Sequence, residues 1–323
     1  MGDRLEKGKT AAAYIPPPVI FYGALRSGTT MLRLVMNMNP ALSCPGETDF
    51  LFDHLRQADD GWRLDRDALA QDRIFNARRI PMPDNPHGRQ AVAELIAALG
   101  AEKPQGRLIL VLHRGLERAL EFLPDSPIVH IVRDPRDVAP SSVRMGWAGD
   151  VYHAVTHWKN TEQDWDNLAP QLAGRNVLEF RFEDFTADPE HWSARLCRFM
   201  GVAYDPQMMR FHETSTYQPI DSRLSSQWRR GSDPAEIALI ESAVGPLIAA
   251  RGYPASDIAP VRLTPARLLR VKLGGKIRRM KFRIDRYGLT DTVLDTLSNR
   301  LRLPSLGQGA RGRMQQVDIR YLK

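Results

Sequence analysis

The sequence predicts an α/β fold, with a central parallel sheet covered by helices on both faces. Helical segments separate a series of short apolar runs, and this alternation is typical of a doubly wound sheet. A strand whose sheet is covered on both faces is apolar along its whole length, and these runs have that character. They are Val19–Tyr22, Leu108–Leu112, Ile128–Val132 and Val177–Phe180.

The helices between these runs carry recognisable start and stop signals. The first run is followed by a glycine-rich turn and a helix over 29–38, which ends near Pro40. The third run ends at Arg133 and turns into the next helix through Asp-Pro-Arg-Asp. After the fourth run, Asp188 and Pro189 are typical of an N-cap and first helical position, and Gly201 of a C-terminal stop. The pattern therefore gives the elements in the order that an α/β sheet requires.

Residues 257–323 are expected to form a basic helical extension of the main domain at 18–256, and residues 1–17 a loose N-terminal arm. Residues 261–323 hold 16 Lys and Arg against 4 Asp and Glu, whereas the other 260 residues hold 29 against 34. Apolar stripes predict two amphipathic helices, one interrupted at Gly274-Gly275 and one ending before Pro304. The cationic extension is expected to contact an acidic partner or an anionic membrane surface.

The composition is typical of a globular protein that is neither disulfide-rich nor membrane-spanning. The chain is 43% hydrophobic, enough for a buried core, and its two cysteines cannot form a disulfide framework. It has no signal-peptide core and no apolar run of membrane-spanning length, which favours a soluble, cytoplasmic protein. Because the positive charge is concentrated in the extension, no nucleic-acid partner is expected.

The segment FYGALRSGTT has the form of an anion-binding loop. Gly23 and Gly28 lie between a strand and a helix, where backbone N–H groups face an anion. The lysine of a triphosphate-binding loop is missing, because Thr29 follows Gly28. A nucleotide kinase is therefore disfavoured, and no metal ion is expected. Side-chain donors for an anion come from Arg26, Ser27, Thr29 and Thr30.

A second candidate anion site follows the Ile128–Val132 strand. Arg133 ends this strand, at the edge of the sheet where the glycine-rich loop must also lie. Ser141 lies about two turns into the next helix. An arginine and a hydroxyl in these positions are suited to holding a second phosphate.

These two segments together resemble the sulfotransferases that use 3′-phosphoadenosine 5′-phosphosulfate (PAPS). The phosphosulfate loop of that family, [KR]-S-G-T-T, matches residues 26–30, and its R-D-P-R-D motif with a later serine matches Arg133 and Ser141. The segment WRRGSDP is similar to a basic loop that closes over the 3′-phosphate. The resemblance runs from about Pro18 to Tyr253 and implies a P-loop-like sulfotransferase fold with PAPS as co-substrate. It also implies that Arg133, Ser141 and either Arg229 or Arg230 hold the 3′-phosphate, with Gly231 in the same basic loop. Trp228 either stacks on the adenine or belongs to the core.

Within the family, the stretch after the loop is most similar to the tyrosylprotein sulfotransferases. Their Cys-Gly-Glu-Glu-Thr-Arg stretch aligns with Cys-Pro-Gly-Glu-Thr-Asp, which puts the catalytic base on Glu47 and implies that Arg26 stabilises the leaving group. Asp49 and Phe182 depart from that subgroup, which has an arginine and a tyrosine there. His54 and His113 are rival bases.

The acceptor stays open among sugar, lipid and small-molecule hydroxyls, phenols and peptide tyrosine. A second hypothesis is a nucleotide-binding or anionic-surface-binding protein with an inactive sulfotransferase-like body. The intact loop at 26–30 favours the enzyme.

Overall fold

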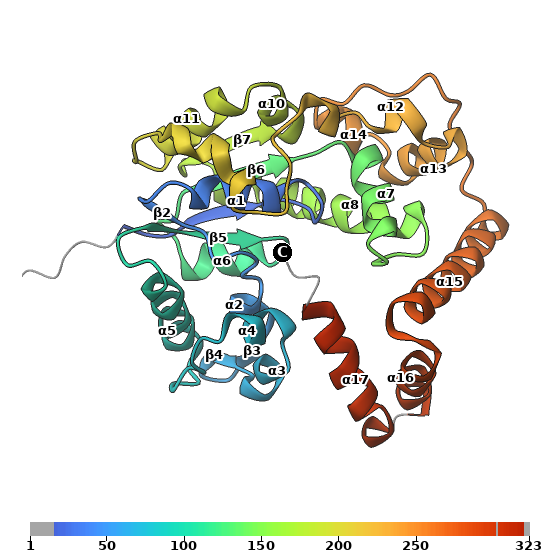
Figure 1. Ribbon diagram of the computed structural model, residues 1–323, viewed down its shortest axis with the longest axis horizontal. Coiled ribbons are helices and arrows are strands. Elements are labelled where there is room, and N and C mark those ends of the chain that lie inside the picture. The colour runs from blue at the N-terminus through green and yellow to red at the C-terminus, as the bar shows by residue number, and fades with distance from the viewer. Residues whose placement is uncertain (1–15, 302, 320–323) are drawn as a thin grey trace, which may run out of the picture.

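The computed structural model describes residues 16–301 and 303–319 (Figure 1). Most of the expected N-terminal arm lies outside these residues. At the centre is a five-stranded sheet in the order β2-β5-β1-β6-β7, and every pair of neighbours is parallel. The strands are β1 (Val19–Tyr22), β2 (Leu42–Ser43), β5 (Arg107–Leu112), β6 (Ile128–Val132) and β7 (Val177–Arg181). The predicted fold class is confirmed. The two-residue strand β2 was not predicted, because no apolar run marks it in the sequence.

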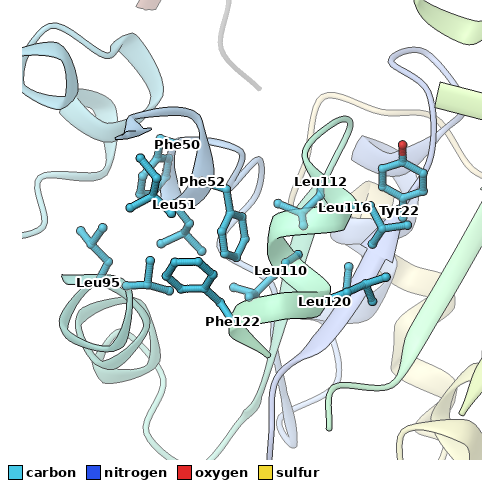
Figure 2. Close-up of a cluster of buried hydrophobic side chains, with 14 of the residues drawn as sticks. Tyr22, Phe50, Leu51, Phe52, Leu95, Leu110, Leu112, Leu116, Leu120 and Phe122 are labelled. Carbon is cyan, nitrogen blue, oxygen red and sulfur yellow. The ribbon is translucent and has the colours of Figure 1, made fainter. Parts of the chain in front are cut away.

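Helices cover both faces of the sheet, and β1 shows how. Val19 and Phe21 contribute to the core beneath α1 (Thr29–Asn37) and α11 (Pro189–Phe199), while Ile20 and Tyr22 contribute to the core on the other face. Successive strand residues point to opposite faces, so one apolar strand supplies both cores. Figure 2 shows the second core, which packs α5 (Gly88–Ala101) and α6 (Leu116–Phe122) against the sheet.

A third core lies beside the carboxyl edge of the sheet. It packs α7 (Pro135–Arg144), α8 (Val151–Asn167) and α13 (Pro234–Val244) around the buried Trp158. Because Val132 of β6 and Val138 of α7 both belong to this core, it holds in place the residues between the end of β6 and the start of α7.

Shorter elements complete the body. An antiparallel hairpin and small helices are inserted between β2 and β5, and the other short helices come after α8 in the chain. They are α2 (Phe50–Asp53), β3 (Leu55–Ala58), β4 (Gly61–Leu64), α3 (Arg66–Ala70), α4 (Arg73–Arg78), α9 (Ala169–Leu172), α10 (Phe182–Ala187), α12 (Trp228–Gly231), α14 (Leu247–Ala250), and 3₁₀ helices at Pro206–Glu213 and Ser222–Leu224.

The C-terminal extension forms three helices: α15 (Pro265–Tyr287), α16 (Leu289–Leu301) and α17 (Pro304–Ile319). In Figure 1 they run away from α13 and return, so that the end of α17 lies towards α4. The prediction of a helix broken at Gly274-Gly275 is wrong, because α15 is continuous through both glycines. The third helix was not predicted. Within 16–301 and 303–319, no helix is both long and apolar enough to cross a membrane.

Gly275 lets α15 approach the body closely. Its neighbours are the backbone of Gly149 and the carboxylate of Asp150, and a Cβ at position 275 would overlap with that carboxylate. Nearby, Arg278 donates a hydrogen bond of 2.6 Å to the carbonyl of Gly149, and Phe282 packs onto Gly146. The glycine pair therefore serves packing, which explains why the helix tolerates it.

The two glycines allow a matched test of this contact. A Gly→Ala change raises helix propensity by about 1 kcal/mol at either position. At Gly274 a Cβ makes only an ordinary contact with Arg278, at 3.6 Å, so Gly274→Ala should raise the melting temperature. Gly275→Ala should lower it, because overpacking typically costs about 1–3 kcal/mol. Limited proteolysis at 257–264 should increase in Gly275→Ala alone; equal behaviour of the two variants would contradict the packing.

Candidate functional site

The glycine-rich loop turns tightly between β1 and α1. Gly28 has a φ of 93°, and a Cβ there would overlap with the ring of Phe182. Arg26 also has a positive φ, 72°. The first N–H groups of α1 have no acceptor within the helix, so they are directed to the end of the sheet. The loop thus has the geometry of an anion site at a helix N-terminus.

Arg133 joins this loop to a distant segment. It follows β6, the neighbour of β1, and its guanidinium donates to the carbonyl oxygens of Arg26 at 3.1 Å and of Leu224 at 2.9 Å. The group also lies 4.5 Å from the centre of the Phe182 ring. From α7, the Ser141 hydroxyl accepts a 3.0 Å hydrogen bond from Arg26 Nε. The structure therefore brings the two sequence motifs into direct contact.

A cavity of about 280 Å³ lies where these residues meet. Its wall includes seven of the predicted site residues: Arg26, Gly28, Thr29, Thr30, Glu47, Arg133 and Ser141. It also includes Arg144, Trp147 and Tyr217, which sequence reasoning did not identify. A larger hollow of about 740 Å³ lies between α8 and α13 and contains no predicted site residue.

The cavity has an excess of positive charge. Burial lowers the pKa of Arg26, and the nearby cations Arg133 and Arg144 lower it further. Burial also lowers the pKa of Arg133, which lies 3.9 Å from the carboxylate of Asp137. The cavity wall carries three guanidinium groups, of Arg26, Arg133 and Arg144, and one carboxylate, of Glu47, and this balance favours a ligand that brings negative charge.

Glu47 lies beside β5 and faces the cavity. A parallel bridge joins it to Val111, and the next residue, Thr48, donates its N–H to the Val111 carbonyl at 2.9 Å. The Glu47 side chain is 37% exposed, and its carboxylate is 3.9 Å from His113 Nε2. The backbone thus holds a solvent-accessible carboxylate at the cavity wall.

The two rival histidines have different positions. His113 lines the cavity, and its Nδ1 donates to the carbonyl of Gly23 at 2.7 Å. Because a carbonyl only accepts, the Nε2 of a neutral ring is unprotonated and faces Glu47. His54 lies outside the cavity wall, with its Nε2 3.0 Å from a carboxylate oxygen of Asp72. The geometry disfavours His54 as a base.

Ser27 does not line the cavity. Its side chain is fully buried, and no hydrogen-bond partner of its hydroxyl is found among the described residues. The expected contribution of this hydroxyl to the cavity is therefore corrected to a position inside the loop.

Trp228 also lies away from the cavity. It is 7% exposed, and its indole N–H donates to Asp134 at 3.0 Å. The guanidinium groups of Arg136 and Arg229 lie over its ring, 3.8 and 4.3 Å from the ring centre. The ring is packed as part of the support for α7 and is absent from the cavity wall.

The neighbours of Trp228 are likewise outside the cavity wall. Arg229, Arg230 and Gly231 are exposed on α12, and Arg230 donates to the backbone carbonyls of Arg223 and Ser225. Just before this segment, Leu224 and Gln227 line the cavity instead.

A second cavity, of about 580 Å³, adjoins the first. The two share the residues Arg26, Thr29, Thr30, Glu47, Met145, Trp147 and Tyr217. The outer wall includes Arg73 and Arg78 of α4, and Arg286 and Asp318 of the extension. Asp318 lies 3.2 Å from Arg286 and 3.9 Å from Arg73. No local sequence signal identifies this wall, because its residues come from segments more than two hundred positions apart.

Asp49 has a structural position. Its buried carboxylate accepts hydrogen bonds from the backbone N–H groups of His113 at 2.8 Å and Arg114 at 3.2 Å. Burial raises its pKa. The departure from the tyrosylprotein sulfotransferase motif at this position therefore supports the turn after β5.

Comparison with known proteins shows what the chain is similar to. Residues 17–206 match the model of a family described as the sulfotransferase family. The protein-tyrosine sulfotransferase of Drosophila melanogaster is 20% identical over 262 residues, 73% of this chain and 52% of the relative. The omega-hydroxy-beta-dihydromenaquinone-9 sulfotransferase Stf3 of Mycobacterium bovis is 26% identical over 175 residues, 46% of this chain and 40% of the relative. The chain thus spans about half the length, or less, of these curated relatives.

Two solved structures share the fold. The sulfotransferase domain of the Synechococcus PCC 7002 olefin synthase has a TM-score of 0.57 and 20% identity, over 78% of this chain and all of that domain. The sulfotransferase domain from the curacin biosynthetic pathway has a TM-score of 0.58 and 18% identity, over 76% of this chain and all of that domain.

Proposed function

Because this chain belongs to the sulfotransferase family, we propose that it transfers a sulfuryl group from PAPS to a hydroxyl or phenol acceptor. The observation that carries the proposal is the convergence of the glycine-rich loop, Arg133, Ser141 and Glu47 on one cationic cavity. We assign this activity to residues 18–256, with the extension at 257–323 completing the outer wall of the adjoining cavity.

The donor set of the smaller cavity fits a nucleotide with phosphates at two positions. The N–H groups at the start of α1 and the hydroxyls of Thr29 and Thr30 suit the 5′-phosphosulfate. Arg133 and Ser141, on the adjacent strand end and helix, suit the 3′-phosphate. Arginine forms paired hydrogen bonds to phosphate oxygens, which makes this position selective for the bisphosphate over nucleotides without a 3′-phosphate.

Arg26 is placed to stabilise the leaving group. Its guanidinium lines both cavities, so it lies where the donor and acceptor spaces meet. Sulfuryl transfer resembles phosphoryl transfer, in which positioning and charge stabilisation contribute most of the rate enhancement. Ser141, which accepts a hydrogen bond from Arg26 Nε, holds the guanidinium in this position.

Glu47 is the proposed general base. Its carboxylate also lines both cavities and accepts the proton of an acceptor hydroxyl bound in the larger one. His113 Nε2 lies 3.9 Å away, beyond hydrogen-bond distance, so it does not hold this carboxylate in place. A phenol, with an ordinary pKa of about 10, requires less of such a base than an aliphatic hydroxyl does.

The relatives bear names for two different acceptors, a protein tyrosine and a menaquinone derivative. Both carry a hydroxyl, and this common chemistry is what we propose for the acceptor here. An inactive body is the weaker hypothesis, since the loop and the cavity-facing carboxylate of Glu47 are both present.

Calorimetric titration with adenosine 3′,5′-bisphosphate, the product nucleotide, tests the proposal. We expect micromolar binding without magnesium, because the cavity supplies its own cations. AMP should bind more weakly, since it lacks the 3′-phosphate that Arg133 and Ser141 are proposed to hold. Absence of binding by protein with a cooperative melting transition would contradict the proposed donor.

A further inference from the structure

The exposed apolar surface of the protein is concentrated in the C-terminal extension. Among the described residues, eleven large apolar side chains are exposed, and Trp147 is the one that lies in the body. The other ten are Leu269, Leu273, Ile277, Met280, Leu289, Val293, Leu297, Leu301, Leu303 and Leu306. A concentration of exposed apolar side chains in one segment is typical of an interaction site.

On α15 the apolar residues point away from the body. With about 3.6 residues per turn, positions 269, 273, 277 and 280 fall on one side of the helix. Gly275 and Phe282, which contact the body, fall on nearly the opposite side. The four apolar side chains are 40–71% exposed, so the docking of α15 leaves this stripe uncovered.

On α16 the usual amphipathic order is reversed. The polar residues Thr292, Asp295 and Ser298 are buried, while a stripe of leucine and valine from Leu289 to Leu301 is exposed. The buried polar face is satisfied: Asp295 accepts a 2.6 Å hydrogen bond from Arg283, and the Thr292 hydroxyl donates to the Arg283 carbonyl at 3.1 Å. A helix that packs its polar side inward and its apolar side outward is suited to an apolar environment outside the protein.

Cations flank the α15 stripe on both sides. The helix carries nine arginines and lysines and one acidic residue, Asp285. Lys272, Lys276 and Arg279 fall along one border of the stripe, and Arg270 and Lys281 along the other. Two copies of this surface facing each other would bring like charges together, which disfavours self-association.

We propose that the outer face of α15 and α16 docks on the surface of an anionic lipid bilayer. A helix with an apolar stripe bordered by lysines and arginines lies in the plane of the interface, with its apolar side among the acyl chains. The cations contact lipid phosphates, and their aliphatic stems add to the apolar contact. This docking goes beyond the proposed sulfuryl transfer and does not depend on the identity of the donor.

Vesicle co-sedimentation of the full chain tests the proposal. The probes are phosphatidylcholine vesicles with and without phosphatidylserine. We expect binding to the phosphatidylserine vesicles, weaker binding to pure phosphatidylcholine, and a decrease with salt, because exposed charges are screened. Equal binding to both vesicles, or binding to neither, would overturn the proposal.

Substitutions separate the apolar and electrostatic contributions. The double variant Leu273→Ser, Ile277→Ser should lower the partition coefficient by about tenfold or more. Neutralising Lys272 and Lys276 to Gln should lower it about fivefold per charge. The same neutralisation of Arg195 and Arg198, exposed on α11 of the body, is the control and should have no effect. All of these side chains are exposed, so melting temperatures should stay unchanged; a serine variant that binds as the wild type does would contradict the assigned surface.

Sedimentation equilibrium tests whether a second copy of the chain, in place of a lipid surface, covers the apolar stripe. A stable dimer that the double serine variant disperses would show that a second copy covers the stripe, and would overturn docking on lipid. Titration with adenosine 3′,5′-bisphosphate, carried out separately, reports on the donor cavity, so failure of one proposal is distinguishable from failure of the other.

Discussion

Replacing Glu47 by glutamine should reduce kcat by about 10²–10⁴ with phenol as the acceptor probe, because the positioned base is lost. The side chain is 37% exposed, so the melting temperature should not change. Binding of adenosine 3′,5′-bisphosphate should also persist, since the substitution leaves the cations of the donor cavity in place. Release of the product nucleotide from PAPS measures the rate.

A more acidic acceptor gives this test a second readout. 4-Nitrophenol is far more ionised at neutral pH than phenol and needs less help from a base. The ratio of wild-type to Glu47→Gln rates should therefore be much smaller with 4-nitrophenol. Glu190→Gln, at an exposed position on α11, is the matched control and should behave as the wild type. An unchanged kcat of Glu47→Gln with phenol would move the role of base to His113, whose Nε2 faces the same cavity.

Replacing Arg133 by alanine should weaken binding of adenosine 3′,5′-bisphosphate by about a hundredfold or more. Hydrogen bonds to charged groups are worth about 1.5–3 kcal/mol each, and a guanidinium can make two to one phosphate. AMP lacks the 3′-phosphate, so its affinity should fall much less. Calorimetric titration of both nucleotides gives the comparison directly.

Arg133 also stabilises the site itself, so the experiment must distinguish a loss of stability from a loss of ligand contact. It donates to the carbonyl oxygens of Arg26 and Leu224, so the alanine variant should lose some stability as well. Arg133→Lys keeps the positive charge but loses the paired donors. Its affinity for adenosine 3′,5′-bisphosphate should therefore lie between those of the wild type and the alanine variant. Arg223→Ala, which removes an exposed arginine paired with Asp221, is the control. Equal losses of affinity for AMP and the bisphosphate would contradict the assigned 3′-phosphate contact.

Two of the candidate site motifs follow directly on strands that the sequence predicts. The loop at 23–30 and Arg133 each continue an apolar run, and neighbouring parallel strands end at the same edge of the sheet. Their mutual contact, seen between Arg133 and the Arg26 carbonyl, therefore follows from strand order. Residues of the late segment WRRGSDP do not follow a strand, and the structure packs Trp228 against Arg136 and Arg229, outside the cavity wall.

The outer wall of the larger cavity could not be predicted from local sequence patterns. Asp318 lies between Arg73 and Arg286 through the return of α17 to the body. This position depends on how α15 docks, which in turn depends on the close approach at Gly275. From the local sequence, a glycine pair in a helical pattern predicts that the helix is interrupted. Only the packing against Gly149 and Asp150 shows that the pair allows a close contact between α15 and the body.

The sequence by itself determined the sheet, the glycine-rich loop with Arg26, and the strand end at Arg133, because each is encoded by a local run of residues. It also determined that the extension is cationic and amphipathic. The tertiary structure decided that Trp228 is packed beneath arginines, that Glu47 faces two cavities, and that α16 turns its apolar side outward. These features arise from contacts between residues far apart in the chain, and such contacts depend on packing that no local pattern contains.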